Sequence, residues 1–534
     1  MQQTRPAVPP TSWPSTASAG DGDDARCRGW AGHYDLSMST AGEVRTVERQ
    51  GTDVIAESER KGRPRGLFWP WFAANISVLG LSYGSFVLGF GISFWQATIV
   101  AVLGVVFSFL LCGVVAIAGK RGSAPTMVLG RAAFGVRGNR LPAFLSWVLT
   151  VGWETALAAL AVLATSTVFR ELGWDDGVVT KIVALIVVAA LVVGAGIAGF
   201  DVIMRLQTWI TVVTGVLTVV YVVLAAPSID LGAIGALPTG SAQNVVGALV
   251  LVMTGFGLGW VNAAADYSRY LPRSASTRGV VGWTTFGGAL APAVLVVVGI
   301  LLAGSSRDLD AAIGADPIGA LTTVLPVWFL VPFALVAVLG LVGGAVLDIY
   351  SSGLALLSAG VRIPRPVAAG VDGVFMVAGA VYVVFFAKDF ISPFQAFLVT
   401  LGVPIAAWCG VFVADVLLRR GPYAERELED RRGRYGDVRW TAVGLVVVGT
   451  ALGWGLVTNT YGVPSWLNWQ GYLLSPVGLG GREGAWAYAN LGVLVALVIG
   501  FVGTLATARR TIRRQEHTPV HAGPADAALR NDES

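Results

Sequence analysis

Charged residues are scarce in this chain. Asp, Glu, Lys and Arg make up 13% of its 534 residues, whereas soluble domains carry about 25%. Hydrophobic residues make up 54%, and uncharged runs such as residues 67–119 are long enough for two membrane spans of roughly 20 residues each. This composition excludes a soluble enzyme and predicts an integral membrane protein.

Cysteine and histidine are also rare. The three cysteines are far apart, and the three histidines lie in polar terminal segments: Cys27, Cys112 and Cys409, and His33, His517 and His521. Such spacing indicates neither a disulfide framework nor a metal site, and it leaves the membrane interior without the ligands of a catalytic metal. We therefore expect no cofactor and no enzymatic activity. A net charge of +4 gives no support to nucleic-acid binding.

Twelve long apolar segments with few or no charged residues, separated by polar or Gly/Pro-rich breaks, predict the membrane spans. They must be helices, because backbone in hydrocarbon has to satisfy its hydrogen bonds internally. The predicted fold is thus all-α, with spans at residues 68–91, 94–118, 142–168, 179–199, 203–226, 244–265, 280–303, 326–357, 366–387, 391–418, 440–460 and 485–508.

Three polar segments complete the predicted organisation. Residues 1–66 and 509–534 have too few apolar residues to form a core, which is typical of disordered tails. Residues 421–439 are rich in charge and predict a solvated linker between the core and the last two helices, within 440–508.

Basic residues gather in alternate loops, chiefly residues 120–140 and 419–439. Short basic loops face the cytoplasm. We therefore expect a multi-pass protein of the plasma membrane with both termini in the cytoplasm.

Two acidic residues fall deep inside predicted spans, Glu154 in the third and Asp348 in the eighth. An ionisable group at membrane depth is expensive and marks a functional site by default. Glu154 can accept a hydrogen bond when ionised and donate one when protonated; a structural clamp between helices is the alternative. Asp372, Asp415 and Asp201 lie close to span ends, where we expect water to reach them.

The first and sixth spans contain runs that are unusual for plain anchors. Residues 75–85 (NISVLGLSYGS) and 255–260 (GFGLGW) mix glycine with polar or aromatic residues, as in the broken helices from which transporters build their sites. The two runs are five spans apart, which predicts an inverted repeat of five plus five helices at about 67–226 and 244–418, within a core of residues 67–420. Close helix packing is the alternative reason for the glycines.

Four motifs carry a family resemblance: residues 71–78 (WFAANISV), 130–138 (GRAAFGVRG), 152–153 (GW) and 265–272 (ADYSRYLP). In this order they resemble the nucleobase:cation symporter family, nearest its purine-cytosine permease branch, over about residues 65–510. The resemblance implies the leucine-transporter fold, with ten core helices plus two, and cation-coupled import of a nucleobase.

The resemblance also implies a substrate site. Phe256 and Trp153 would flank the base, Glu154 stands where relatives carry Gln or Asn, and Trp147 is the alternative to Trp153. The full candidate set for substrate binding is Asn75, Ser77, Trp153, Glu154, Phe256, Gly257 and Asp348.

For the coupling cation, the resemblance implies that backbone carbonyls at Ala73 and Ile76 would bind Na⁺ together with two hydroxyl residues of the eighth span. Those hydroxyl positions correspond to Gly343 and Gly344. Because two ligands are missing and two intramembrane carboxyls are present, H⁺ is favoured over Na⁺, with Glu154 and Asp348 as the proton-coupling candidates.

The sequence also allows other functions. A transporter of an amino acid, a thiamine-like vitamin, a hydantoin or allantoin, coupled to Na⁺, could share the fold. A channel or membrane enzyme has no support, because the chain shows no repeated filter and no cluster of catalytic side chains.

Two further groups of residues have candidate roles. Asp266 and Arg269 predict a salt bridge at a helix end, with gating as the alternative, and Trp466, Trp469 and Tyr472 are typical of an interfacial aromatic belt.

Overall fold

The computed structural model describes residues 51–459 and 468–518, and every regular element in these ranges is a helix. Each of the twelve predicted spans coincides with a helix or a broken helix. The spans are α1 (Phe68–Asn75) with α2 (Leu79–Leu88), α3 (Phe94–Gly122), α6 (Arg140–Glu171), α7 (Val178–Ala198), α8 (Phe200–Ala225), α10 (Ala242–Gly255) with α11 (Gly257–Trp260) and α12 (Ala264–Ser268), α13 (Thr277–Ser305), α15 (Leu330–Ser358), α16 (Arg365–Phe385), α17 (Ile391–Leu418), α18 (Trp440–Trp454) and α19 (Leu491–Thr507).

Four short helices connect these spans: α4 (Thr126–Leu129), α5 (Arg131–Phe134), α9 (Leu231–Gly235) and α14 (Arg307–Ala315). A further short helix, α20 (Arg509–His517), follows the last span. Within the described ranges, nine helices are long and apolar enough to cross a bilayer, or eleven if each bent pair is counted as one span. Because α18 has only 15 residues, the predicted total of twelve is consistent with this structure without being fixed by it.

Both predicted helix breaks are confirmed. The first span bends by 68° between α1 and α2, where Ile76 leaves the helical region with φ −84° and ψ 82°. The sixth span breaks at Phe256, which has φ −121° and ψ −105° and separates α10 from α11. Broken helices expose backbone groups that a continuous helix would use internally.

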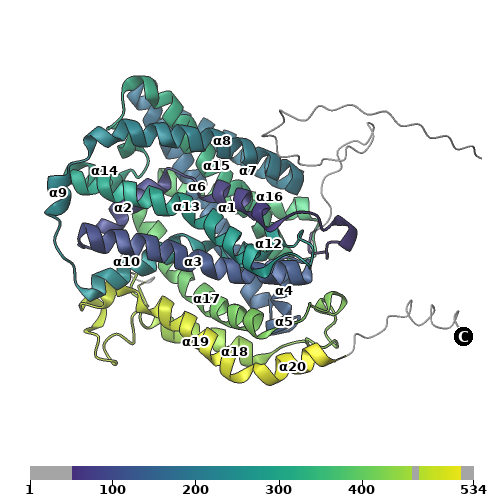
Figure 1. The fold of residues 1–534 in the computed structure, drawn as a ribbon. Helices are drawn as coiled ribbons and strands as arrows, with labels where there is room; N and C mark the ends of the chain where they lie inside the picture. The colour runs from purple at the N-terminus through teal and green to yellow at the C-terminus, as the bar shows by residue number, and fades with distance from the viewer. Residues whose placement is uncertain (1–50, 460–467, 519–534) are drawn as a thin grey trace, which may run out of the picture. The chain divides into compact units, whose positions relative to one another are not determined.

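Long helices pack around these breaks. α13 lies against α1, α2 and α3, and α15 lies against α6 and α8. The C-terminal helices α18 and α19 run beside α17, along one edge of the ribbon in Figure 1. The breaks are therefore held between helices from distant parts of the sequence.

The contact between α2 and α13 depends on glycine. A Cβ atom at Gly299 would overlap the backbone of Leu81, and a Cβ at Gly84 would overlap the backbone of Gly299 itself. Glycine at these positions lets two helix backbones approach closely, as is common in membrane proteins.

We expect Gly299→Ala to destabilise the protein by about 1–3 kcal/mol, since an added methyl in a tight contact forces backbone shifts. The measurement is thermal unfolding of the detergent-solubilised protein. Gly282→Ala is the matched control on the same helix, because no heavy atom lies within 4 Å of a Cβ placed there. Equal unfolding temperatures for the two variants would contradict the close contact.

The predicted N-terminal tail is partly wrong. Residues 1–50 lie outside the described residues, but residues 51–66 pack against the helices. Ile55 is buried and donates its N–H to the Ser123 carbonyl at 2.9 Å. The buried Arg60 guanidinium forms ion pairs with Glu57 at 2.9 Å and Glu425 at 3.0 Å. These contacts with distant residues compensate for the lack of local apolar sequence.

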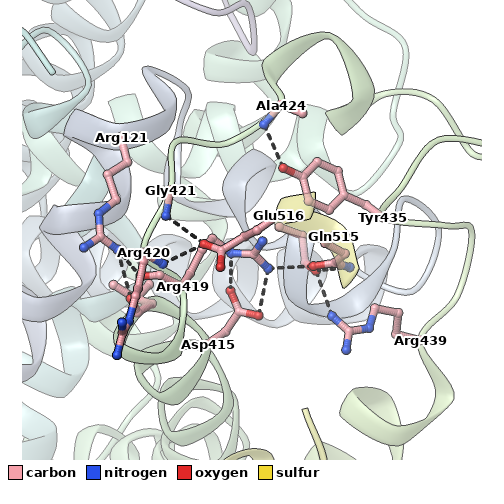
Figure 2. A network of polar contacts seen from close by, with 12 residues as sticks. Arg121, Asp415, Arg419, Arg420, Gly421, Ala424, Tyr435, Arg439, Gln515 and Glu516 are labelled. Carbon is pink, nitrogen blue, oxygen red and sulfur yellow. Dashed lines mark hydrogen bonds and ion pairs between the residues drawn. The ribbon is translucent and has the colours of Figure 1, made fainter. Parts of the chain in front are cut away.

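The predicted linker and C-terminal tail also differ from the structure. Figure 2 shows α20 docked against the end of α17 and residues 419–439. Gln515 Oε1 accepts a hydrogen bond from Arg419 at 2.9 Å, and Arg419 forms an ion pair with Asp415 at 3.1 Å. Glu516 accepts hydrogen bonds from the N–H groups of Arg420 and Gly421.

Residues 421–439 therefore pack rather than forming a solvated linker, with Tyr423, Leu428 and Tyr435 buried. Residues 509–517 form a helix, and residues 519–534 lie outside the described ranges. Asp415 is 1% exposed, so the expectation that water reaches it is wrong: α20 covers the end of its helix.

Candidate substrate site

Four aromatic rings form a cluster beside the break in the sixth span. We call Tyr83, Trp153, Phe256 and Phe394 the aromatic cluster. The Phe256 ring lies 4.7 Å from the Tyr83 ring, Tyr83 lies 6.4 Å from Phe394, and Phe394 lies 5.3 Å from Trp153, measured between centroids. The structure thus brings the two predicted stacking residues, Trp153 and Phe256, into one cluster.

Two polar atoms of this cluster have no hydrogen-bond partner in the described part of the chain. The Tyr83 hydroxyl and the Trp153 Nε1 are both buried and form no hydrogen bond with any described residue. Glycines make room for them: a Cβ at Gly255 would overlap the Tyr83 hydroxyl, and a Cβ at Gly259 would lie 3.0 Å from Trp153 Nε1. Buried polar groups normally have partners, so these two atoms are exceptions among the described residues.

Three other candidates make local contacts. The Asn75 side chain donates to the Trp71 carbonyl at 2.8 Å, and Ser77 Oγ accepts from the Leu79 N–H at 3.3 Å. Gly257 donates its N–H to Ser108 Oγ at 3.1 Å, and its carbonyl accepts from Cys112 Sγ at 3.0 Å. These groups fix the two breaks, and the backbone of Gly257 is engaged by α3.

Glu154 and Asp348 belong to a second group. We call Glu154, Asp348 and Asp372 the acid cluster; their exposed fractions are 0%, 1% and 0%. Glu154 lies on the same face of α6 as Trp147, two turns further along the helix, and Trp147 Nε1 donates a hydrogen bond to Asp372. Both carboxylate oxygens of Glu154 lack a hydrogen-bond partner within the described part of the chain, and so does Oδ2 of Asp348.

Asp372 is the member of the acid cluster that accepts hydrogen bonds from other side chains. Trp147 Nε1 donates to its Oδ1 at 2.6 Å, and Ser352 Oγ donates to its Oδ2 at 2.8 Å. Trp147, the alternative stacking residue, is therefore held in the acid cluster and not among the four aromatic rings. The expectation that water reaches Asp372 is also wrong, because α6 and α15 cover it.

The predicted site residues thus form two groups, which face different sides of α6. Trp153 and Glu154 are sequence neighbours, and successive residues of a helix point about 100° apart. Trp153 contacts Phe394 and Phe397 of α17, whereas Glu154 lies on the face of α6 from which Trp147 contacts Asp372 of α16.

Glycines of α15 face the first helix break. A Cβ at Gly340 would lie 3.3 Å from the Ile76 carbonyl, and one at Gly344 would lie 3.9 Å from the Ala74 carbonyl. Gly343 instead faces α8, where Gln207 Nε2 donates to its carbonyl at 2.6 Å. The two positions at which the resemblance implied hydroxyl ligands of Na⁺, Gly343 and Gly344, supply no side-chain oxygen next to Ala73 and Ile76.

Gln207 was not among the candidate site residues predicted from the sequence. Its Oε1 is buried with no partner among the described residues and would lie 3.4 Å from a Cβ at Gly343. Within the described ranges, no group of three or more His, Cys, Asp or Glu has the arrangement of a metal site.

Asp266 and Arg269 bind different partners. Asp266 Oδ1 accepts from the Thr126 N–H and hydroxyl, both at 2.7 Å. Arg269 donates to the Tyr350 hydroxyl at 2.7 Å and to the Gly51 carbonyl at 3.1 Å. These contacts tie α12 to α4, to α15 and to the segment before α1.

The predicted aromatic belt is only partly described. Trp469 and Tyr472 are 42% and 44% exposed, and Trp469 packs edge-on against Trp454 with ring centroids 5.0 Å apart. Trp466 lies outside the described residues.

An open hollow of about 470 Å³ lies near the aromatic cluster. It is bounded by the end of α2, the starts of α10 and α17, and α14, and its lining includes Phe86, Phe90, Asn244, Asp310 and Gln395. Phe86 contacts Tyr83 with centroids 5.4 Å apart. Burial raises the pKa of Asp310, although a hydrogen bond from Ser85 at 2.6 Å opposes the shift. The hollow and the cluster are therefore separated by the ring of Phe86.

Comparison with known proteins decides the family. The family model described as "Permease for cytosine/purines, uracil, thiamine, allantoin" matches residues 54–475. The chain belongs to this permease family. The permease is therefore a membrane transporter and not an enzyme, as predicted.

Curated and solved relatives agree. The chain is 24% identical over 410 residues to the putative purine-cytosine permease YxlA of Bacillus subtilis (strain 168), which covers 74% of this chain and 84% of that protein. It resembles the nucleobase-cation-symport-1 family transporter Mhp1 in a closed conformation with bromovinylhydantoin bound, with 18% identity, 91% of this chain and 100% of that chain covered, and a TM-score of 0.66.

The inward-facing conformation of Mhp1 matches similarly, with a TM-score of 0.64, 18% identity, and coverage of 92% of this chain and 98% of that one. These likenesses confirm the predicted fold class for the permease: an all-α membrane protein of the leucine-transporter type.

Proposed function

We propose that this permease imports a nucleobase of the cytosine or purine type, coupled to protons, across the plasma membrane, with both termini in the cytoplasm. The observation that carries the proposal is the aromatic cluster with its unpartnered Tyr83 hydroxyl and Trp153 Nε1. A nucleobase is flat and rimmed by donors and acceptors, so it needs aromatic faces to stack on and a few fixed polar groups.

The comparisons support this substrate class. The family description names cytosine and purines first, and the Bacillus relative is named as a putative purine-cytosine permease. The Mhp1 structure holds a hydantoin, which is also a flat ring with amide edges. The hollow that ends at Phe86 supplies the outer entrance in this orientation.

Proton coupling is supported by two features of the spans. Glycine occupies the positions of α15 where a sodium site of this kind would need hydroxyls, and Na⁺ requires several oxygen ligands. Instead, three buried carboxyls lie on helices that pack against one another: Glu154 on α6, Asp348 on α15 and Asp372 on α16. A buried carboxylate without partners is costly, and taking up a proton removes that cost.

The test is uptake by the purified permease in liposomes. We expect labelled cytosine, adenine, hypoxanthine, guanine or uracil to accumulate under an inward proton gradient, to be lost with a protonophore, and to persist when choline replaces sodium. Protein-free liposomes are the control.

Three results would contradict the proposal. Competition by thiamine, allantoin, a hydantoin or an amino acid but by no nucleobase would refute the substrate class. A strict need for sodium would refute proton coupling. An absence of both uptake and ligand-induced thermal stabilisation with every nucleobase would refute the proposed function as a whole.

A further inference from the structure

We propose that the permease binds an anionic phospholipid at the bend between α19 and α20, with the lipid phosphate in a crevice at the start of α18. The residues of this site belong to neither the aromatic cluster nor the acid cluster. The inference therefore goes beyond the proposed function and does not depend on which substrate or cation is transported.

The crevice lies where α17, α18, α19 and α20 meet. Its volume is about 40 Å³, whereas one water molecule needs roughly 10–15 Å³, so a phosphate group has room there. Its polar lining residues are Asp415, Arg439, Thr441, Thr504, Thr507 and Thr511. The one carboxylate among them, Asp415, is already paired with Arg419 at 3.1 Å. The remaining polar groups are a guanidinium and four hydroxyls, which suit an anion.

Thr504 supplies the observation that indicates a ligand. Its side chain lines the crevice and is 3% exposed, and its hydroxyl has no hydrogen-bond partner among the described residues. Buried hydroxyls are normally bonded. The neighbouring Thr507, for comparison, donates to the Gly503 carbonyl of its own helix at 2.7 Å. The Thr504 hydroxyl is therefore able to donate to an oxygen atom in the crevice.

The start of α18 supplies positive charge. Arg439 donates one N–H to the Ala132 carbonyl at 3.0 Å and forms no ion pair within the described part of the chain, which leaves other donors of its guanidinium for an anion. It lies beside the network of Asp415, Arg419 and Gln515 (Figure 2). No side chain caps the first turn of α18, so the positive end of its dipole and its free N–H groups also favour an anion.

The helices that flank the crevice favour a lipid over free phosphate. Both expose apolar side chains along their length: Val447 and Val448 of α18, and Val498 and Val502 of α19. Trp440, the first residue of α18, is exposed as well, and Trp residues at span ends are typical of the headgroup level of a bilayer. A phosphate bound in the crevice would therefore place its acyl chains along α18 and α19.

α20 favours a headgroup that carries a net negative charge. The helix bends by 58° from α19 and is about 13 Å long, as expected for nine residues, so it stays close to the headgroup level. Ile512 and Gln515 face the protein. Its exposed arginines have no acidic partner among the described residues: Arg509, Arg510, Arg513 and Arg514. Basic clusters on such helices attract anionic lipids.

The test measures binding of phosphatidylglycerol to the full-length permease in an uncharged detergent. The readouts are lipid-bound species in native mass spectrometry and the unfolding temperature, which a ligand of the folded state raises. We expect phosphatidylglycerol to bind and stabilise the parent. Phosphatidylcholine and inorganic phosphate should each require at least about tenfold higher concentrations for the same effect, because one lacks the net charge and the other lacks the acyl chains.

Thr504→Val tests the crevice, because it removes the hydroxyl with little change of shape. Without lipid this variant should be at least as stable as the parent, since an unpartnered buried hydroxyl is costly. The phosphatidylglycerol concentration for half-maximal stabilisation should rise about tenfold, because a hydrogen bond to a charged group is lost. Thr450→Val is the matched control: Thr450 of α18 is buried and unpartnered within the described ranges, but it does not line the crevice.

Replacing the four exposed arginines of α20 by glutamine tests the preference for an anionic headgroup. This variant should bind phosphatidylglycerol no more tightly than phosphatidylcholine. The matched control replaces four other exposed arginines: Arg63, Arg65, Arg278 and Arg362. It should retain the preference of the parent, because these residues lie outside the proposed site.

Several outcomes would overturn the lipid site. Parental affinity for phosphatidylglycerol in Thr504→Val would mean that the crevice holds water. Equal binding of phosphatidylglycerol and phosphatidylcholine by the parent would remove the role of α20, as would an equal loss in the two fourfold variants. Inorganic phosphate that stabilises the parent as well as the lipid does would identify a site for a free anion instead. If Thr504→Val does not fold, the α20 variant decides, because its substitutions are on exposed side chains.

Discussion

Replacing Glu154 by glutamine is expected to abolish accumulation of substrate against a gradient while substrate binding and exchange survive. Glutamine matches the size of the side chain and can form hydrogen bonds, but it cannot take up or release a proton. Glu154 is fully buried and both of its oxygens lack partners among the described residues. The variant therefore removes the titrating group without introducing a cavity.

The measurement combines thermal shift with substrate, counterflow, and uptake under an imposed pH gradient. Glu154→Asp is the conservative comparison: it retains an ionisable group, and we expect it to recover part of the accumulation that glutamine loses. If Glu154→Gln still concentrates substrate when the external pH is lowered, Glu154 is a substrate contact or a helix clamp. Asp348, with its own unpartnered Oδ2, then becomes the coupling candidate.

Most of the helical framework could be predicted from local sequence, for a physical reason. Membrane spans have to be helices of nearly fixed length, and the glycine-rich and polar runs at residues 75–85 and 255–260 marked the two breaks. The polar segments at residues 51–66 and 509–517 were misjudged. The composition of such a segment predicts that it cannot form a hydrophobic core of its own. It does not predict ion pairs with residues far away in the sequence, such as the pair between Arg60 and Glu425.

The division of the site could not be predicted in the same way. Trp153 and Glu154 are neighbours in sequence, and only the packing of α15, α16 and α17 around α6 shows that they face different clusters. Tyr83 lay within a run already interpreted as a break, so its ring was overlooked. Phe394 lies in a largely apolar span, where nothing in the sequence distinguishes a residue of the site from one that packs in the core.

The position of Asp372 illustrates a further limit. Because Asp372 is close to the end of its span, we predicted that water reaches it. Instead, Trp147 of α6 and Ser352 of α15 pack against it and donate hydrogen bonds to its carboxylate. Depth along one helix does not determine burial when adjacent helices end at different levels. The same argument applies to Asp415, which α20 covers.

Phe256→Ala is expected to weaken nucleobase binding by about 1–3 kcal/mol, the range found for stacking of a base on an aromatic side chain. Phe256 is 7% exposed, occupies the break itself, and packs 4.7 Å from Tyr83. Because Phe256 lies at the break between α10 and α11, and not inside a helix, the loss should fall on ligand affinity. Phe256→Tyr retains the aromatic face and should bind almost as well as the parent.

The control must separate loss of stacking from loss of packing. Phe412→Ala removes an equally large buried ring, one that stacks on Trp408 at 5.3 Å within α17 and lies outside both clusters. Both alanine variants should lower the unfolding temperature, since each leaves a cavity, but only Phe256→Ala should shift the substrate concentration needed for half-maximal thermal stabilisation. Parental affinity in Phe256→Ala would mean that this ring only packs, and the base would then have to bind elsewhere in the permease.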